Sequence, residues 1–163
     1  MKQDLRDLSP PAPPASDAGD VEAQLALVRA IMSESIPFNR ELGIEVGALS
    51  VGRAVLSIPF RAALIGDSAR PALHGGVISA LLDTAGGAAV WTAIGLNDRP
   101  STIDLRVDYL RPGRAETLIA EAEVLRMGNR VGVTSIRAYH PDRPGETIAE
   151  GKGVYAVKRA DDR

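Results

Sequence analysis

Residues 72–94, ALHGGVISALLDTAGGAAVWTAI, constrain the fold more than any other part of the chain. From residue 76 onward this stretch holds a single ionisable residue, Asp83, and it ends just before Gly95. The preceding Pro71 and glycine pair and the terminal glycine are typical of the two ends of a long helix. So apolar a helix must be surrounded by the rest of the fold. A lone carboxylate in it is costly to bury unless a neighbour or a reaction uses it.

Composition is that of one soluble globular domain. The chain has 163 residues, 45% of them hydrophobic, and its net charge of −2 gives no electrostatic basis for binding nucleic acid or an anionic membrane. The absence of cysteine excludes disulfides, thiolate metal ligands and cysteine nucleophiles, and two histidines are too few for a histidine-rich metal site. We expect no metal, no cofactor and, without a signal peptide or membrane span, a cytoplasmic location.

The rest of the pattern predicts an α+β fold. Residues 1–20 are charged and then rich in proline and alanine, which predicts a disordered tail before a single domain at 21–163. Apolar spacing over 21–35 indicates an N-terminal helix, and alternation within 38–60 indicates two strands joined by a turn at 50–52. Residues 61–73 are expected to form a loop. Four further strands, at 103–109, 117–126, 131–139 and 147–158, are expected to form an antiparallel meander, giving six strands around the central helix.

The central helix brings together groups suited to acyl chemistry. On a helix Gly76, Ser79, Asp83 and Gly87 fall along one stripe of small residues, so a ligand or another chain can approach the carboxylate closely. The backbone N–H groups at the helix start, of Gly75, Gly76 and Val77, are expected to be unpaired and able to stabilise an oxyanion.

Helix geometry separates these two features. Gly75 and Asp83 are eight residues apart, which is about 12 Å at about 1.5 Å per residue. One substrate carbonyl cannot contact both groups of one helix. If both act on one substrate, Asp83 must come from a second subunit, which predicts a composite site at a two-fold interface.

Each feature also has a simpler explanation. Asp83 could be a structural hydrogen-bonding residue, His74 could serve only as a helix cap, and Gly86-Gly87 could serve only to let the helix pack closely. Only the combination favours a catalytic site.

The pattern resembles a known family. Three stretches carry the resemblance: His74-Gly75-Gly76 with Asp83 seven residues after the second glycine, the later STIDLRVDYLRP at 101–112, and the earlier IPFNRELGIEV at 36–46. Together they are similar to the hot-dog-fold acyl-CoA thioesterases of the phenylacetate-pathway type. The resemblance covers about residues 21–158. It implies a long central helix wrapped by a six-stranded sheet, hydrolysis of acyl-CoA to a free acid and coenzyme A, and a homodimer that could double to a homotetramer.

The resemblance also implies roles for individual residues. The N–H of Gly75, with that of Gly76, would polarise the thioester carbonyl, and His74 would orient this corner. Asp83 of the neighbouring subunit would act as general base or nucleophile. Thr102 stands where family members carry a Ser or Thr that holds the water or the carboxylate. Strand alternation places Ile103 toward the helix and Thr102 on the opposite face, and either a twist or a bulge at the strand start would turn Thr102 inward.

Two further expectations concern the substrate. Family members have an Asn or Gln about six residues before the histidine, where this chain has Ser68, and Ser68 could substitute for it. The phosphates of coenzyme A call for basic residues, and we expect them among those after the helix: Arg106, Arg111 and Arg130 first, then Arg114, Arg126 and Lys152.

Three alternatives remain open from the sequence. A hot-dog dehydratase or hydratase would use His74 with Asp83 for proton abstraction. A non-catalytic acyl-CoA-binding module would explain Ser68 in place of an amide side chain. A purely structural oligomer would leave Asp83 without a use.

Overall fold

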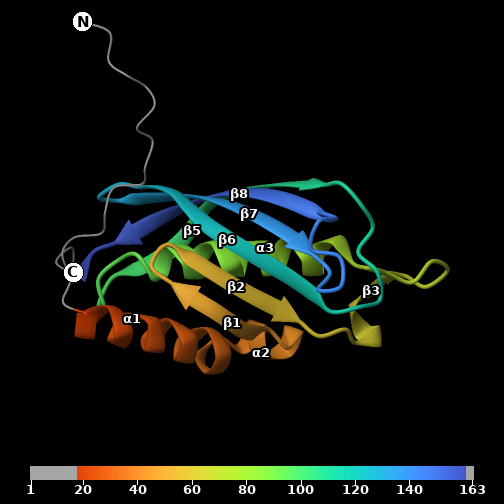
Figure 1. The fold of residues 1–163 in the computed structure, drawn as a ribbon, viewed down its shortest axis with the longest axis horizontal. Coiled ribbons are helices and arrows are strands. Elements are labelled where there is room, and N and C mark those ends of the chain that lie inside the picture. Colours follow the sequence, from red (N-terminus) through yellow and green to blue (C-terminus); the bar gives the residue numbers. More distant parts are fainter. Residues whose placement is uncertain (1–17, 161–163) are drawn as a thin grey trace, which may run out of the picture.

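The computed structural model describes residues 18–160, in which one antiparallel sheet wraps around one long helix (Figure 1). The helix is α3 (Gly75–Trp91), and the sheet has the strand order β1-β2-β6-β7-β8-β5. The six strands are β1 (Glu45–Ser50), β2 (Arg53–Ile58), β5 (Arg99–Tyr109), β6 (Leu118–Met127), β7 (Val131–Tyr139) and β8 (Ala149–Lys158). The predicted α+β hot-dog fold is confirmed.

Helix α3 is the centre of the hydrophobic core. Leu81, Leu82, Ala85, Ala88 and Ala89 on this helix are fully buried. They face inward side chains of the sheet such as Leu56, Leu118 and Ile136. Full burial of each large aliphatic side chain stabilises the fold by about 1.5–3 kcal/mol. This packing explains why α3 tolerates so few polar residues and makes Asp83 an exception.

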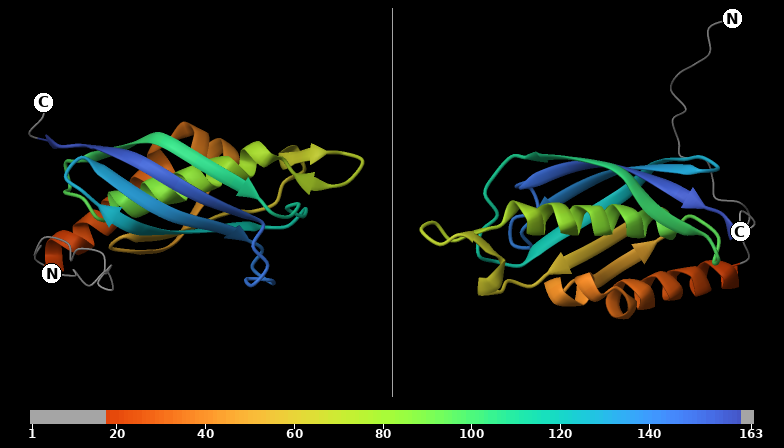
Figure 2. Two further views of the ribbon diagram at one scale, coloured as in Figure 1. Left: turned by 90° about the horizontal axis from the view of Figure 1, so that it is seen from above. Right: turned by 180° about the vertical axis from the view of Figure 1, so that it is seen from behind.

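The two edges of the sheet differ in whether another element covers them. Beside β1 lies helix α1 (Ala18–Ala30), whose Arg29 donates hydrogen bonds of 2.7 Å to the carbonyl oxygens of both Val46 and Gly47 (Figure 1). The other edge strand, β5, has no described element beyond it and exposes Ile103 and Tyr109 (Figure 2). Natural proteins rarely leave an eleven-residue edge unprotected.

The N-terminal boundaries differ from those expected. Helix α1 begins at Ala18, so residues 18–20 of the expected tail are helical, and residues 1–17 lie outside the described part of the chain. A π-helical turn (Ile31–Ser35) and the short helix α2 (Pro37–Leu42) follow. The first part of the stretch 38–60, in which two strands were expected, is therefore helical, because Pro37 favours a helix start and Gly43, at φ 71°, ends the helix in a left-handed conformation.

The expected four-strand meander was also wrong. Only β6, β7 and β8 form one; β5 pairs with β8 at the far edge, and β6 returns to pair with β2. The reason is α3, which crosses beneath the sheet and delivers the chain to the opposite edge (Figure 2). The expected loop at 61–73 contains a 3₁₀ turn (Ala62–Leu64) and a two-stranded ribbon of β3 (Ile65–Asp67) and β4 (Ala72–Leu73).

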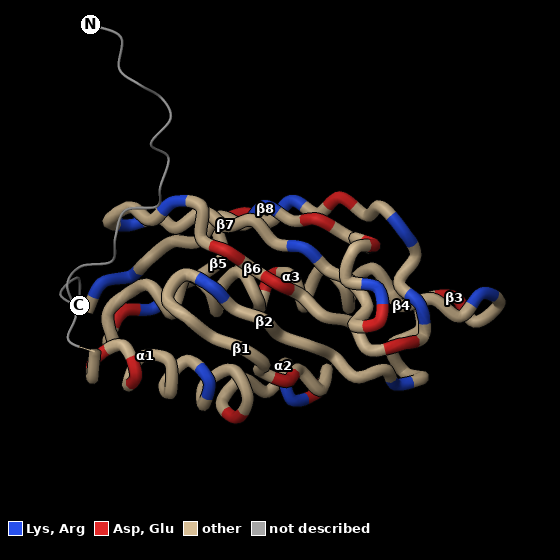
Figure 3. The backbone as a smooth tube through the Cα atoms, viewed as in Figure 1, with Lys and Arg blue, Asp and Glu red and all other residues tan. Residues whose placement is uncertain are grey.

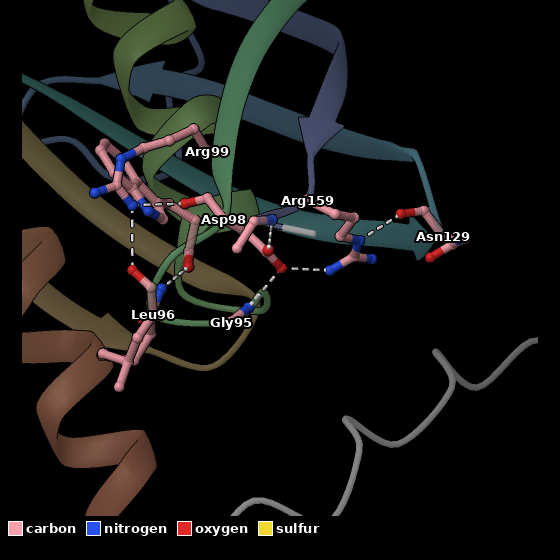
Figure 4. A network of polar contacts seen from close by, with 9 residues as sticks. Gly95, Leu96, Asp98, Arg99, Asn129 and Arg159 are labelled. Atoms are coloured by element: carbon pink, nitrogen blue, oxygen red, sulfur yellow. Dashed lines mark hydrogen bonds and ion pairs between the residues drawn. The ribbon is translucent and has the colours of Figure 1, made fainter. Parts of the chain in front are cut away.

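A buried carboxylate fastens the far end of the fold. Asp98 accepts hydrogen bonds from the N–H of Gly95 (3.1 Å) and of Ala160 (3.0 Å), and it forms an ion pair with Arg159 (2.6 Å), as Figure 4 shows. Arg159 also donates to the carbonyl of Asn129. Burial raises the pKa of Asp98, but the hydrogen bonds and the charge of Arg159 outweigh it, and the net pKa is lowered. Asp98 thus ties the end of β8 to the loop after α3.

Between residues 18 and 160, no helix has both the length and the apolar character needed to cross a membrane.

Candidate active site

The corner before α3 is held by His74. Its Nδ1 accepts the N–H of Gly76 at 2.9 Å, its carbonyl accepts the N–H of Val77 at 2.9 Å, and its own N–H donates to the carbonyl of Leu64. Because Nδ1 accepts a hydrogen bond, a neutral His74 ring carries its proton on Nε2. Gly66 packs against the histidine backbone so closely that a Cβ there would lie 2.8 Å from the His74 Cα.

These bonds correct the expectation of three free amides. The N–H groups of Gly76 and Val77 already have acceptors on His74, so Gly76 is not available to polarise a carbonyl. Within residues 18–160, no acceptor bonds the N–H of Gly75. Gly75 is positioned from its other side, where the Tyr109 hydroxyl donates to its carbonyl oxygen at 3.1 Å. The corner therefore offers one oriented backbone donor.

Asp83 lies in the middle of α3 and accepts hydrogen bonds from hydroxyl groups on two strands. Thr102 Oγ1 on β5 donates to Asp83 Oδ1 at 3.0 Å. The Tyr155 hydroxyl on β8 donates to the Asp83 backbone carbonyl at 3.0 Å and lies 3.4 Å from Oδ1. Asp83 Oδ2 accepts no hydrogen bond from any described residue. One carboxylate oxygen is therefore fixed while the other is left for a substrate or a water.

A β-bulge brings Thr102 to this position. Along β5, Thr102 pairs with Tyr155 and Asp104 pairs with Val154, so Ile103 is an extra residue without a partner on β8. Strand alternation shifts by one at such a bulge. Thr102 therefore shares the inner face with Leu105, and Ile103 is 59% exposed and does not face the helix as strict alternation predicted.

Sequence reasoning missed Tyr155. Its side chain is 1% exposed, and it fits against two glycines: a Cβ on Gly86 would lie 2.1 Å from its hydroxyl oxygen, and one on Gly153 would lie 2.5 Å from its ring. Burial, with the nearby charge of Asp83, raises the pKa of Tyr155, so the hydroxyl remains a donor. The sequence did contain one signal, which is that a large residue is matched by small ones. Tyr155 follows small inward-facing residues on β8 and lies opposite the Gly86-Gly87 pair of α3.

Ser68 is not brought to the rest of the site within one chain. It is exposed in the turn between β3 and β4, where Asp67 Oδ1 accepts the N–H of Ala69. The ribbon projects beyond the body of the molecule (Figures 1 and 2). No described hydrogen bond joins Ser68 to His74, Gly75 or Asp83, and its substitute role stays a prediction.

The basic residues expected to meet coenzyme A lie on the strands and turns that follow α3. Arg106 bonds Asp108 on its own strand, Arg111 donates to the carbonyl of Thr147, and Arg130 lies in the exposed turn between β6 and β7. Lys152 donates to Ser135 on the outer face of the sheet. Acidic and basic residues are interleaved over the view in Figure 3, without a uniformly basic face. Their role in phosphate binding remains untested.

Within the described residues, no group of three or more His, Asp or Glu side chains is placed to hold a metal ion.

Comparison with known proteins agrees with this architecture. The sequence profile of the Thioesterase superfamily matches residues 71–146, which include the His74 corner, Asp83 and Thr102. The medium/long-chain acyl-CoA thioesterase YigI of Escherichia coli K12 is 36% identical over 149 residues, covering 83% of this chain and 95% of YigI.

Solved structures show the same fold. A Shewanella oneidensis protein related to the thioesterase superfamily has a TM-score of 0.76 at 30% identity, covering 88% of this chain and 100% of that one. The Escherichia coli PaaI protein from the phenylacetic acid degradation operon has a TM-score of 0.75 at 25% identity, covering 85% of this chain and 96% of PaaI. The chain therefore belongs to the thioesterase superfamily and has its hot-dog fold, as the sequence motifs implied.

Proposed function

We propose that the protein hydrolyses acyl-CoA thioesters at a site shared between two subunits. The observation that carries the proposal is the Asp83 carboxylate, held through one oxygen by Thr102 in a helix with no other ionisable side chain. The similarity of this chain to YigI, which is named as a medium/long-chain acyl-CoA thioesterase, supports the substrate class. Medium- and long-chain acyl-CoAs are therefore the first substrates to test.

The chemistry needs a group that attacks and a group that stabilises the oxyanion. Asp83 deprotonates a water that attacks the thioester carbon, or attacks that carbon itself. The N–H of Gly75 donates to the carbonyl oxygen as it becomes negative. The C–S bond then breaks, and coenzyme A leaves as a thiolate that takes up a proton. If a water attacked, this step forms the free acid; if Asp83 attacked, a water then hydrolyses the mixed anhydride, which releases the acid and restores the carboxylate.

The distance between Gly75 and Asp83 supports a site shared between subunits. Gly75 is the first residue of α3 and Asp83 lies in the middle of the same helix. The rise between them is about 12 Å, which is too far for one carbonyl group to contact both. A second chain related by a two-fold axis, with its α3 roughly antiparallel, would place its Gly75 beside the first chain's Asp83.

The open edge supports this assembly. Strand β5 carries Thr102, and no strand of the described residues lies beyond it. It exposes the apolar side chains of Ile103 and Tyr109, and Leu110 directly after it is exposed too. Arg29 and α1 close the opposite edge. Joining two sheets through β5 would cover that apolar surface and enclose the exposed side of Thr102 and Asp83.

The test is release of free thiol from short, medium, long and aromatic acyl-CoAs, run beside Asp83→Asn. Asn keeps the volume of Asp but cannot act as a base. Asp142→Asn, the same change in the exposed turn after β7, is the matched control. Thiol release lost only in Asp83→Asn supports the proposal. Binding of acyl-CoA without thiol release would instead favour an acyl-CoA-binding module, and hydration of an enoyl-CoA would favour a hydratase.

A further inference from the structure

Tyr155 has a feature that core packing does not explain. Its side chain is almost completely buried, yet it carries a hydroxyl that a phenylalanine would lack. Burying a hydroxyl costs free energy unless it finds a hydrogen-bond partner. The hydroxyl donates to the Asp83 backbone carbonyl (3.0 Å) and lies 3.4 Å from Asp83 Oδ1, and Thr134 of the core and the N–H of Gly87 also approach it.

Two glycines make room for this contact. A Cβ on Gly86 would lie 2.1 Å from the Tyr155 hydroxyl oxygen, and a Cβ on Gly153 would lie 2.5 Å from a ring carbon and 2.7 Å from the hydroxyl oxygen. Any side chain at either position would displace the phenol. A glycine in a helix interior destabilises the helix relative to alanine. Gly86 is in that position, and it lets the tyrosine hydroxyl reach the turn of α3 that carries Asp83.

The register places Tyr155 beside Thr102. The two residues are direct partners between β8 and β5, and both hydroxyls approach Asp83 Oδ1. Thr102 is exposed and lies on the open side of the site, whereas Tyr155 approaches from the buried side. The carboxylate is thus held from two directions.

We propose that Tyr155 is a positioning residue that fixes the Asp83 carboxylate from beneath, in a space created by Gly86 and Gly153. The inference rests on the proposed function, in which Asp83 is the reacting group. Tyr155 itself does not touch the substrate. It holds the backbone turn and one carboxylate oxygen of Asp83, so that the other oxygen points to the reacting carbon.

The test compares Tyr155→Phe with wild type. This change keeps the ring that fills the core and removes only the hydroxyl. We expect kcat to fall about three- to tenfold with KM unchanged within about twofold, since one hydrogen bond to a reacting group is lost and no substrate contact. Tyr139→Phe removes a hydroxyl from the neighbouring strand β7, outside the site, and is expected to leave both constants unchanged.

A merely structural role is tested in the Asp83→Asn background. If Tyr155 acts through Asp83, adding Tyr155→Phe changes the residual rate by less than about twofold. An equal fall of the rate in both backgrounds would overturn the proposal, as would a wild-type kcat in Tyr155→Phe.

Crystal structures of wild type and Tyr155→Phe keep this test separate from the proposed function. The proposal predicts that the Asp83 carboxylate changes rotamer or loses its single position in the variant. An unchanged Asp83 bonded to Thr102 would contradict it, even if the wild type hydrolyses acyl-CoA. A wild type without thioesterase activity would refute the proposed function, and the position of Asp83 would still decide the role of Tyr155.

Discussion

Thr102 and Asp83 are joined by a 3.0 Å hydrogen bond that exists because β5 bulges at Ile103. With regular alternation along β5, Thr102 would face away from the helix and Ile103 would face it. The bulge replaces an apolar neighbour of the carboxylate by a hydrogen-bond donor. Bulges of this kind re-aim side chains beside active sites.

The first prediction concerns this hydroxyl. Thr102→Val keeps the branched shape and removes the donor to Asp83 Oδ1, and we expect about a tenfold loss of kcat, corresponding to about 1.4 kcal/mol. Thr102→Ser keeps the donor and should retain most activity. Steady-state kinetics on one acyl-CoA measures both. Equal losses in the two variants would show that shape, and not the hydroxyl, is needed.

The second prediction concerns the N–H of Gly75. Proline is well accepted at the first position of a helix and has no N–H, and the φ and ψ of His74, −62° and 134°, suit a residue before proline. We expect Gly75→Pro to fold and to lose about 100-fold in kcat, the usual cost of an oxyanion donor. Gly75→Ala keeps the N–H, and its Cβ would lie 3.5 Å from the Tyr109 ring, an ordinary contact. Its activity should therefore stay near that of wild type, and inactivity of both variants would point to a steric effect.

The third prediction concerns the open edge. Ile103→Asp adds a charge to the exposed apolar surface of β5, and we expect a shift from dimer to monomer in light scattering with a parallel loss of activity. Leu125→Asp makes the same kind of change at an exposed leucine of β6, away from this edge, and should alter neither property. A monomeric Ile103→Asp variant with full activity would refute the shared site.

The fourth prediction concerns stability and pH. Because the pKa of Asp98 is lowered by folding, its contribution to the free energy of unfolding is present above its usual value of 3.8 and is lost as the pH falls below it. We expect Asp98→Asn to cost about 1–3 kcal/mol near pH 7 and progressively less below about pH 4. Urea unfolding at both pH values measures this difference. A constant difference would mean that the charge of Asp98 does not contribute.

The sequence predicted the elements better than their arrangement. The apolar run of α3 and the alternation in β6, β7 and β8 reflect local periodicity, so their positions agree closely with the structure. The pairing of β5 with β8 could not be predicted from local periodicity, because it depends on the path of α3 across the sheet. Proline and glycine signals at Pro37 and Gly43 were present but were outweighed by the alternation of Leu42, Ile44 and Val46.

For the site, the motif predicted that Asp83 and Thr102 lie together but not how the neighbouring groups are hydrogen-bonded. Asp83 and Thr102 meet as the resemblance implied. The capture of the Gly76 amide by His74 depends on a side-chain rotamer, and the approach of Tyr155 depends on the space left by Gly86 and Gly153. Neither has a fixed spacing in the sequence.

The central claim is that one subunit supplies Gly75 and the other Asp83, and mixing two inactive variants tests it most directly. In a heterodimer of Gly75→Pro and Asp83→Asn, a shared site has one intact centre, formed by Gly75 of one chain and Asp83 of the other. The account predicts that the purified heterodimer recovers about half of the wild-type thiol release, as one of two sites is intact. A site contained in one chain would leave every centre defective, so a heterodimer as inactive as its parents would contradict the account.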